Sequence, residues 1–453
     1  MHIPAHSLFR AYDIRGVVDI DLNAADFLSI GHAYASMLAE RCQCRTPLIV
    51  AMRDGRNSSP NLMEAMVEGM LKAGAHVLDA GVGPTPMCYF ATHHLNADGC
   101  VMITGSHNPP NHNGAKFMVE GLSLYGAELA ALRRRIEHNQ LLHSRGKREE
   151  VDMHEEYLFE LNKALGQSAG LEKLSVGFDA GNGAAGPVIA QLLSHHRSRP
   201  HVGLYLDSDG QFPNHHPDPA EPKNLADLQR AVLAEKLDLG VAFDGDGDRM
   251  GAVDDLGRPV SPDHLLMLLA GDVLAHEPGA TIIADVKTSD AFFARVKAQG
   301  GTPLMWMTGH AHIKTKMLQA NAKFAGEASG HIFFADSYYG YDDGLYAAMR
   351  LIRLVAESGQ KLSALVDVLP ALYTTEEIRV PCPDAEKFAV IERLQQQFPT
   401  AVTLDGLRVS TEDGWFLIRA SNTQAVLSAR AEGNSPEALV RLRAQVDSLL
   451  SVK

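Results

Sequence analysis

The sequence predicts an α/β protein of several mixed-sheet units that ends in a smaller α+β unit. Apolar, strand-like runs alternate with helical patterns for most of the chain, and this pattern restarts at residues 173, 237 and 281. Such alternation is typical of parallel or mixed sheets covered by helices. The pattern changes after residue 369, where strand pairs and one final helix are expected. Together these observations predict the fold class.

The first unit shows the alternation most clearly. Apolar residues at helical spacing predict a helix over 24–42, and a strand follows at 48–51. Ser59 and a proline at the first helical position open a second helix, which we expect to end near residue 73. Strands are expected at 75–80 and 100–104.

The later units are expected to repeat this design without a strict sequence repeat. Strands are predicted at 174–179 and 239–243, and a strand pair at 407–419 and 424–432 precedes a helix that runs from 435 to about 450. At roughly 150 residues per domain, 453 residues correspond to about three domains. The expected limits of the four units are 1–149, 150–257, 258–369 and 370–453.

Three predicted strands end in glycine-rich polar tips, at 104–108, 244–249 and 326–331. Ligands of α/β sheets bind beyond the carboxyl ends of the strands. We therefore expect the three tips to face one central cleft.

Composition narrows the classes of function. The formal net charge is 41 − 55 = −14, so neither nucleic acid nor an anionic membrane is an expected partner. The N-terminus lacks the pattern of a signal peptide, and no run approaches the 18 apolar residues typical of a membrane span. The five cysteines, at 42, 44, 88, 100 and 382, are dispersed and favour reduced thiols in a cytoplasmic protein.

Asp244, Asp246 and Asp248 alternate with glycines directly after a predicted strand. Hard carboxylate oxygens converging on one centre suit Mg²⁺ or Ca²⁺. The start of an EF-hand loop is similar, but Arg249 replaces the required glycine and Asp255 replaces the glutamate at the twelfth position. The other reading is a solvated acidic turn. Because three unpaired carboxylates repel, a divalent metal is the favoured interpretation.

Ser106 stands on the tip 104–108, where packing requires no serine. One reading is a helix N-cap or loop serine. Another is a Ser-His-Asp hydrolase, which the absence of a G-x-S-x-G elbow disfavours. A third is a phosphoryl carrier beside the three aspartates, with His107 and Lys116 supplying positive charge or moving a proton.

Residues 181–186 form a complete G-x-G-x-x-G, and Asp207 lies about 20 residues further on, as in dinucleotide-binding proteins. This motif leaves a dehydrogenase among the possible functions. The other reading is that the glycines let a helix pack closely against its strand, since a dinucleotide site explains neither the aspartates nor Ser106.

Two further polar segments have the chemistry to bind a sugar phosphate. Glu327 and Ser329, on the same side of an expected extended segment, are suited to polyol hydroxyls, although a turn with a buried glutamate is the alternative. A second set combines a guanidinium, hydroxyls and an amide, which suit a phosphate dianion: Arg419, Ser421, Asn422 and Thr423.

The chain resembles the α-D-phosphohexomutases, and among them the bacterial phosphomannomutase/phosphoglucomutase group. The similarity is carried by separated motifs in the family's order: residues 9–16, 104–116, 244–249, 308–310, 326–331 and 419–423. The resemblance implies three related α/β domains and a smaller C-terminal domain around a central cleft. It also implies a monomer that binds small sugar phosphates.

The resemblance further implies that Ser106 is a phosphoserine and that Mg²⁺ is held by Ser106 and the three aspartates. The enzyme would interconvert hexose 1-phosphate and hexose 6-phosphate of mannose or glucose through a bound hexose 1,6-bisphosphate. Glucose or mannose 1,6-bisphosphate would be the activator. By the same resemblance, the acid/base candidates are Arg15, His107, Lys116 and His331, and the substrate-binding candidates are Tyr12, Arg249, Lys287, Gly309, His310, Glu327, Ser329, Arg419, Ser421, Asn422 and Thr423.

Two departures from the family pattern concern the phosphate loop, where Gln424 and Ala425 follow Thr423, and Ala311, which replaces the usual serine. The alternatives are a phosphoglucosamine mutase, an NAD-dependent dehydrogenase that uses 181–186, and a non-catalytic protein that binds sugar phosphate with a metal.

Overall fold

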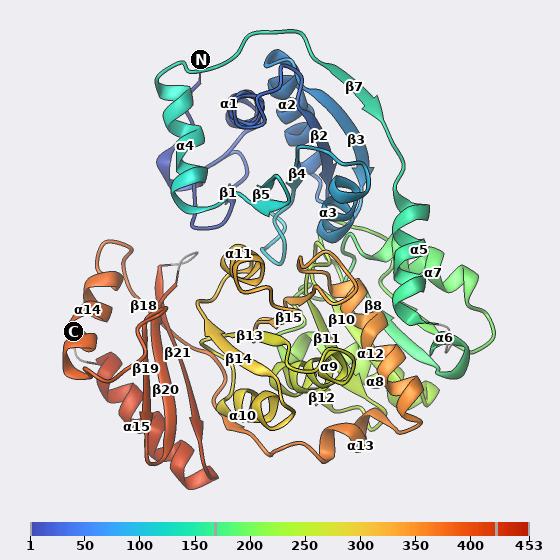
Figure 1. Ribbon diagram of the computed structural model, residues 1–453, viewed down its shortest axis with the longest axis vertical. Coiled ribbons are helices and arrows are strands. Elements are labelled where there is room, and N and C mark those ends of the chain that lie inside the picture. Colours follow the sequence, from blue (N-terminus) through green and yellow to red (C-terminus); the bar gives the residue numbers. More distant parts are fainter. Residues whose placement is uncertain (1, 167–169, 422–424, 452–453) are drawn as a thin grey trace.

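Four β-sheets, each with its own helices, organise the protein (Figure 1). The computed structural model describes residues 2–166, 170–421 and 425–451. The α/β class and the distinct C-terminal unit are confirmed. Among the described residues, no helix combines the length and the apolar character that crossing a membrane requires.

The first sheet has seven strands of mixed direction. In spatial order they are β1 (Ile14–Val17), β5 (His112–Val119), β4 (Gly99–Ile103), β2 (Leu48–Arg53), β3 (His76–Val82) and β7 (Lys147–Glu150), with β6 (Leu122–Ser123) beside β5. Its helices are the 3₁₀-helix η1 (His6–Leu8), α1 (Ala24–Arg41), α2 (Ser59–Lys72), α3 (Thr85–His94) and α4 (Gly126–Glu137). The helices and strands expected in this unit are confirmed to within two residues. β4 and β5 run antiparallel, so the loop that joins them turns back at one end of the sheet.

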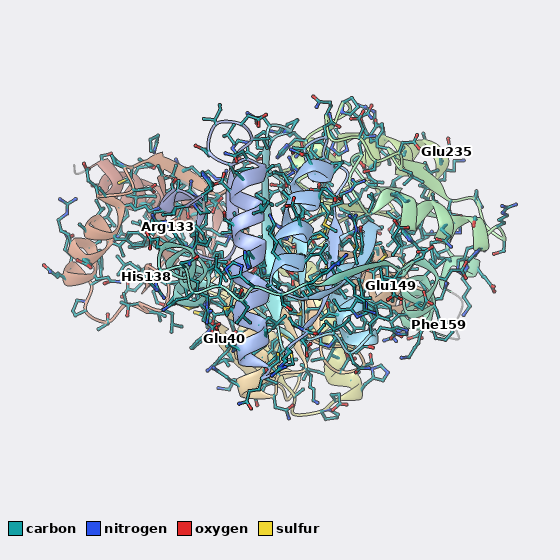
Figure 2. The ribbon with its side chains drawn as sticks, turned by 90° about the horizontal axis from the view of Figure 1, so that it is seen from above. Glu40, Arg133, His138, Glu149, Phe159 and Glu235 are labelled. Carbon is teal, nitrogen blue, oxygen red and sulfur yellow. The ribbon has the colours of Figure 1, made fainter. Side chains whose placement is uncertain are left out.

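Helix α1 begins where its sequence provides a cap. The Asn23 side chain accepts a hydrogen bond from Ala25 N at 2.9 Å, and Asp26 accepts one from Asn23 N at 2.8 Å. This reciprocal pair satisfies amides that the helix itself leaves free. Figure 2 looks onto α1 and α2, which run side by side over the first sheet and pack against each other.

The second sheet has the order β12 (Pro259–Val260), β11 (Met250–Asp254), β10 (Leu239–Phe243), β8 (Val176–Asp179) and β9 (Val202–Leu204). Its helices are α5 (His154–Leu165), α6 (Gly170–Lys173), α7 (Gly186–His195), η2 (Pro222–Leu225) and α8 (Ala226–Glu235). β10 is buried along its whole length and pairs antiparallel with β11. The turn between these two strands carries the three aspartates.

The third sheet has the order β14 (Thr302–Trp306), β13 (Thr281–Asp285), β15 (Phe324–Gly326) and β16 (Ile332–Phe334). Its helices are α9 (Pro262–His276), α10 (Asp290–Ala298), α11 (His310–Ala320), α12 (Gly344–Ser358) and α13 (Leu362–Asp367). α12 also packs against α5 of the second unit. Tyr157 on α5 donates a hydrogen bond at 2.9 Å to Asp343, which caps α12. These contacts fix the second and third units against each other.

The fourth sheet is antiparallel, in the order β17 (Tyr373–Thr374), β21 (Val426–Gly433), β20 (Gly414–Ala420) and β19 (Leu407–Thr411), with β18 (Ile378–Pro381) also on β21. Helices α14 (Lys387–Gln397) and α15 (Pro436–Ser451) complete this unit. The prediction of one strand over 407–419 was wrong, because a tight turn divides this segment into β19 and β20. Gly414 at the end of this turn has φ +136°, a conformation that favours glycine.

The glycines of 181–186 serve packing. A Cβ on Gly183 would come within 2.9 Å of the Gly245 carbonyl oxygen, and one on Gly186 within 2.0 Å of the Leu206 carbonyl oxygen. Ala184 N donates to Gly245 O at 2.9 Å. This turn is therefore seated directly against the aspartate loop, and the close-packing interpretation replaces the dinucleotide one.

Candidate active site

A cavity of about 940 Å³ lies where the four units meet. Its walls include residues of all four units, and each of the three predicted polar tips contributes to it. Fourteen of the predicted catalytic and substrate-binding residues line it: Tyr12, Arg15, Ser106, His107, Lys116, Arg249, Lys287, Gly309, His310, Glu327, Ser329, His331, Arg419 and Ser421. Asn422 and Thr423 lie outside the described residues.

Ser106 lies in the loop between β4 and β5 and is almost completely buried. Its hydroxyl donates a hydrogen bond of 3.0 Å to Asp244 Oδ2, and its amide donates one of 2.8 Å to Thr104 Oγ1. The backbone at Ser106 has φ +48°, which is unusual for a residue with a side chain. The loop is not helical, so the helix-cap interpretation of this serine was wrong.

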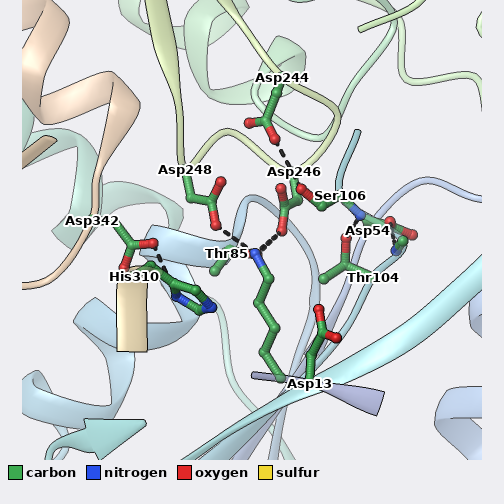
Figure 3. A network of polar contacts seen from close by, with 12 residues as sticks. Asp13, Asp54, Thr85, Thr104, Ser106, Asp244, Asp246, Asp248, His310 and Asp342 are labelled. Carbon is green, nitrogen blue, oxygen red and sulfur yellow. Dashed lines mark hydrogen bonds and ion pairs between the residues drawn. The ribbon is translucent and has the colours of Figure 1, made fainter. Parts of the chain in front are cut away.

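Asp244, Asp246 and Asp248 are fully buried in the turn between β10 and β11, and their carboxylates lie within 4.8 Å of one another (Figure 3). Burial and the two neighbouring carboxylates raise the pKa of Asp244 well above its ordinary value. The buried triplet therefore strongly favours a compensating cation.

Lys116 on β5 is one of the cations that face this triplet. Its Nζ lies 2.7 Å from Asp246 Oδ2 and also contacts Asp248. Burial opposes the charge of Lys116, but the two aspartates outweigh it and raise the pKa of the amine. Lys116 is therefore held in its charged form.

The donor set fits a hard divalent cation. Oδ1 of Asp246 and Oδ1 of Asp248 are buried without a hydrogen-bond partner, which is costly for carboxylate oxygens. The Ser106 hydroxyl adds a fourth oxygen beside Asp244. Oxygen ligands of this kind match Mg²⁺.

His331 is held from both sides. Its Nδ1 lies 3.1 Å from Asp342 Oδ2, and its Nε2 accepts a hydrogen bond of 3.0 Å from Arg249 Nε. Arg249 therefore occupies Nε2 of this ring, and Asp342 faces the opposite nitrogen.

Asp342 also joins His310 to this network, with Oδ2 3.2 Å from His310 Nδ1. Lys314 Nζ donates to the other oxygen of Asp342 at 2.8 Å. Burial and the Lys314 charge lower the pKa of His310 to about 4, so this ring is neutral at pH 7. Neither Asp342 nor Lys314 belongs to a local motif, so neither was predicted from the sequence.

His107 is paired with Asp218, a third residue that was not predicted from the sequence. Its Nδ1 lies 3.0 Å from Asp218 Oδ2. Burial and the charge of Arg249 lower the pKa of His107 to about 4. The ring is therefore neutral at pH 7 and is oriented by the carboxylate. Two histidines in the preceding run 214–217 were the one sequence feature that could have drawn attention to Asp218.

Arg15 projects into the cavity from β1. Its Nη2 contacts Asp13 Oδ2 at 2.5 Å, and its Nη1 donates to Asn108 Oδ1 at 3.2 Å. Arg15 is therefore tied to the loop that carries Ser106.

Glu327 and Ser329 lie on a turn, so the expectation of an extended segment was wrong. Gly330 N donates to Glu327 O at 3.0 Å, which closes the turn. The Glu327 side chain is buried, its Oε1 accepts a hydrogen bond from Gly309 N, and burial raises its pKa. Tyr12 OH donates to Thr308 O at 2.9 Å, so the first unit contacts the same corner of the cavity.

Arg419 at the end of β20 brings the fourth unit to the cavity. Its guanidinium is paired with Asp405, with Nη2 and Oδ2 3.0 Å apart. The same Oδ2 accepts a hydrogen bond of 3.1 Å from Thr308 N. Asp405 therefore links Arg419 to the segment that contacts Tyr12 and Glu327.

A buried serine beside three carboxylates and a lysine, in a cavity with further cationic walls between four α/β-type units, defines an enzyme of phosphoryl transfer. The comparisons with known proteins identify the family. Models of the four phosphoglucomutase/phosphomannomutase domains match residues 6–143 (alpha/beta/alpha domain I), 155–257 (domain II), 261–373 (domain III) and 377–449 (C-terminal domain). The chain belongs to the phosphoglucomutase/phosphomannomutase family.

Relatives of known sequence match over nearly the whole chain. A phosphomannomutase/phosphoglucomutase of Pseudomonas aeruginosa is 43% identical over 445 residues, which are 97% of this chain and 94% of that protein. A phosphoglucomutase of Neisseria meningitidis is 39% identical over 454 residues, which cover 98% and 97% of the two chains.

Solved structures share the fold. A phosphoglucomutase/phosphomannomutase family protein from Burkholderia thailandensis superposes with a TM-score of 0.89 at 40% identity, over 99% of this chain and 98% of that chain. An N-acetylphosphoglucosamine mutase from Aspergillus fumigatus, solved with GlcNAc-6P and magnesium, has a TM-score of 0.63 at 16% identity, over 98% and 95% of the chains. The latter likeness concerns the fold alone.

Proposed function

We propose that this protein interconverts hexose 1-phosphate and hexose 6-phosphate, of mannose, glucose or both, through a phosphorylated Ser106 and a bound hexose 1,6-bisphosphate. The observation that carries the proposal is the contact of the Ser106 hydroxyl with Asp244, inside a cavity lined by all four units. The names of the relatives at 39–43% identity support the same reaction.

The proposed reaction conserves the phosphoryl group in two transfers. In the first, a sugar hydroxyl attacks phosphorus, a sugar O–P bond forms, the Ser106 O–P bond breaks, the sugar hydroxyl proton leaves to a base, and the Ser106 oxygen takes up a proton. The bisphosphate then turns around in the cavity. In the second transfer the Ser106 hydroxyl attacks the other phosphate, a Ser106 O–P bond forms, and the sugar O–P bond at that phosphate breaks. The Ser106 proton leaves to a base, and the released sugar oxygen takes up a proton. Positioning and charge neutralisation supply most of the catalysis in such reactions.

Asp244, Asp246, Asp248 and the oxygen of Ser106 would hold Mg²⁺, which supplies charge neutralisation at the transferring phosphoryl group. Lys116 adds a fixed positive charge beside these ligands. Of the four acid/base candidates, Arg15 is tied to the serine loop through Asn108, and His107, which lies within that loop, is neutral and oriented by Asp218. His331 would act once a bound ligand draws Arg249 away from Nε2.

The remaining residues would hold the sugar. The buried carboxylate of Glu327 and the hydroxyl of Ser329 would bind sugar hydroxyls that remain equivalent in both orientations of the bisphosphate. Arg419 and Ser421, with Asn422 and Thr423, would bind the phosphate that is not reacting. Tyr12, Arg249, Lys287, Gly309 and His310 would line the path between these two regions.

We further propose that glucose or mannose 1,6-bisphosphate is the activator, that the protein acts as a monomer on small sugar phosphates, and that it works in the cytoplasm. A phosphoglucosamine mutase is not favoured, because the relatives at 39–43% identity bear phosphomannomutase or phosphoglucomutase names. The dehydrogenase loses its support because the 181–186 glycines pack against the aspartate loop.

The decisive experiment measures conversion of glucose 1-phosphate and, separately, mannose 1-phosphate with Mg²⁺ and a trace of the corresponding 1,6-bisphosphate. The proposal predicts turnover of at least one of them and incorporation of labelled phosphate on Ser106. Turnover of neither, with a well-folded protein, would contradict it. Glucosamine 1-phosphate serves as the comparison substrate, and faster turnover of it would favour the phosphoglucosamine alternative.

A further inference from the structure

Arg56 lies behind the loop that carries Ser106, in the turn between β2 and α2, and is 1% exposed. Its two terminal nitrogens donate to four carbonyl oxygens of that loop. Nη2 contacts the oxygens of Ser106 and Asn108 at 2.7 and 2.6 Å. Nη1 contacts those of Pro109 and His112 at 2.6 and 3.0 Å.

Asp54 anchors this guanidinium and also holds the start of the loop. Its Oδ2 lies 3.2 Å from Arg56 Nε and accepts a hydrogen bond of 3.2 Å from Gly105 N. Its Oδ1 accepts hydrogen bonds from Ser59 Oγ at 2.5 Å and from Arg56 N at 3.0 Å. The buried Asp54–Arg56 pair therefore ties the loop to the start of α2, with Asp54 holding the Gly105 amide and Arg56 holding the loop carbonyls. Hydrogen bonds with a charged partner are the stronger ones.

The loop conformation that Arg56 supports is energetically unfavourable by itself. Ser106 has a left-handed φ of +48°, and such a backbone persists only where its surroundings determine it. The space around the guanidinium is also closed. A Cβ on Gly105 would come within 2.6 Å of Arg56 Nε, and the ring of Phe212, from the second unit, covers the guanidinium at 5.0 Å.

We propose that Arg56 is the positioning residue of the phosphoserine loop. By binding four carbonyl oxygens at once, it fixes the backbone at Ser106 so that the hydroxyl faces Asp244, and it places a positive charge beside the same loop. Arg56 touches no reacting atom and acts only through Ser106. The inference rests on the proposed function for its effect on rate, whereas its effect on the loop is independent of the reaction.

Lysine at this position tests the proposal, because it keeps the charge but lacks the planar fork that reaches four oxygens. Displacement of a reacting group by about 1 Å costs on the order of 10²-fold in rate. We therefore expect Arg56→Lys to lower the rate of phosphoryl transfer from phosphorylated Ser106 to glucose 1-phosphate by about 10²-fold. The KM should change by less than about threefold, because the substrate-binding residues are untouched.

Arg350→Lys is the matched control. Arg350 is equally buried and is paired with Asp272 at 2.8 Å and Asp336 at 2.9 Å, away from the cavity lining. We expect this control to lower the thermal midpoint without changing the transfer rate per folded molecule. Rates are measured at a temperature where both variants are folded by circular dichroism.

Amide hydrogen exchange across residues 104–113 provides the readout that does not depend on the reaction. These amides should exchange faster in Arg56→Lys, whereas in Arg350→Lys they should exchange as in the wild type. If Arg56→Lys does not fold, Asp54→Asn replaces it, since it removes the anchor while leaving the guanidinium in place.

A folded Arg56→Lys with wild-type exchange and a transfer rate within threefold of wild type would overturn the proposal. Equal rate losses per folded molecule in Arg56→Lys and Arg350→Lys would reduce Arg56 to a general structural role and would also overturn it. Failure of the wild type to transfer phosphate would refute the proposed function instead, and the exchange of 104–113 would then decide the Arg56 proposal alone.

Discussion

The hydroxyl of Ser106 lies 3.0 Å from Asp244 Oδ2, although 138 positions separate the two residues in the chain. Each stands at the end of a buried strand in a different sheet, and the cavity lies where these strand ends converge. This contact joins the proposed phosphoryl carrier to the proposed metal ligands, and the first two predictions depend on it.

Ser106→Ala should lower turnover of the preferred sugar 1-phosphate by at least about 10³-fold, because no other group would carry the phosphoryl in transit. Incorporation of labelled phosphate from the 1,6-bisphosphate should be lost as well. The assay is a steady-state rate at saturating substrate. Ser194→Ala, on α7, is the control and should match the wild type. Undiminished turnover in Ser106→Ala would exclude a phosphoserine mechanism.

Mg²⁺ should stabilise the protein, because it would satisfy the unpartnered oxygens of Asp246 and Asp248. Binding to the folded state alone stabilises it by about 2.7 kcal/mol at 100 times the Kd. Thermal unfolding with EDTA and with increasing Mg²⁺ measures this, and the midpoint should rise with the ion. Asp248→Asn should remove most of the shift, and Asp447→Asn, at an exposed position of α15, should retain it. A midpoint independent of Mg²⁺ in the wild type would argue against the site.

Asp343 should make stability decrease between about pH 4 and pH 7. Burial raises the pKa of this carboxyl to about 7, although Tyr157 and Tyr338 donate to it. The folded state then binds the proton more tightly than the unfolded state, so its stabilising effect is complete below the unfolded pKa and is lost as the pH rises through the folded one. The slope is about 1.4 kcal/mol per pH unit for one proton.

Urea unfolding of the wild type and of Asp343→Asn at pH 5, 6 and 7 checks this sign. Asparagine retains the cap of α12 but does not titrate. The free energy of unfolding of the wild type should therefore fall relative to that of Asp343→Asn as the pH rises. Asp447→Asn serves again as the exposed control. A constant difference across the three pH values would show that Asp343 is ionised throughout.

Arg419→Ala should raise the KM for sugar phosphate by roughly 10²-fold while lowering kcat much less, because a guanidinium–phosphate pair contributes to binding in both orientations. It would also leave Asp405 without its buried partner, so the variant's fold is checked by circular dichroism. Arg441→Ala, which removes an exposed ion pair on α15, should leave both constants unchanged. A loss confined to kcat would place Arg419 at the reacting phosphate instead.

Local pattern predicted most of the secondary structure and the position of the cavity. Apolar periodicity located α1, α2 and the strands around them, because an element that buries one face has apolar residues at a regular spacing. The turn that divides 407–419 was missed although Asp413-Gly414 between two apolar runs is a typical hairpin signal. Glu327 was misplaced on an extended segment because its turn closes through backbone atoms that carry no side-chain signal.

The sequence by itself determined the α/β class, the polar strand tips and the chemistry each tip offers, because these follow from residue types and short-range spacing. Only the tertiary structure decided how the tips are paired: His107 with Asp218, His331 with Asp342, and the Ser106 loop with Arg56. Those partners stand 111, 11 and 50 positions from the residues they hold. Contacts of this kind arise from how sheets and loops pack, and no local pattern in the sequence marks them.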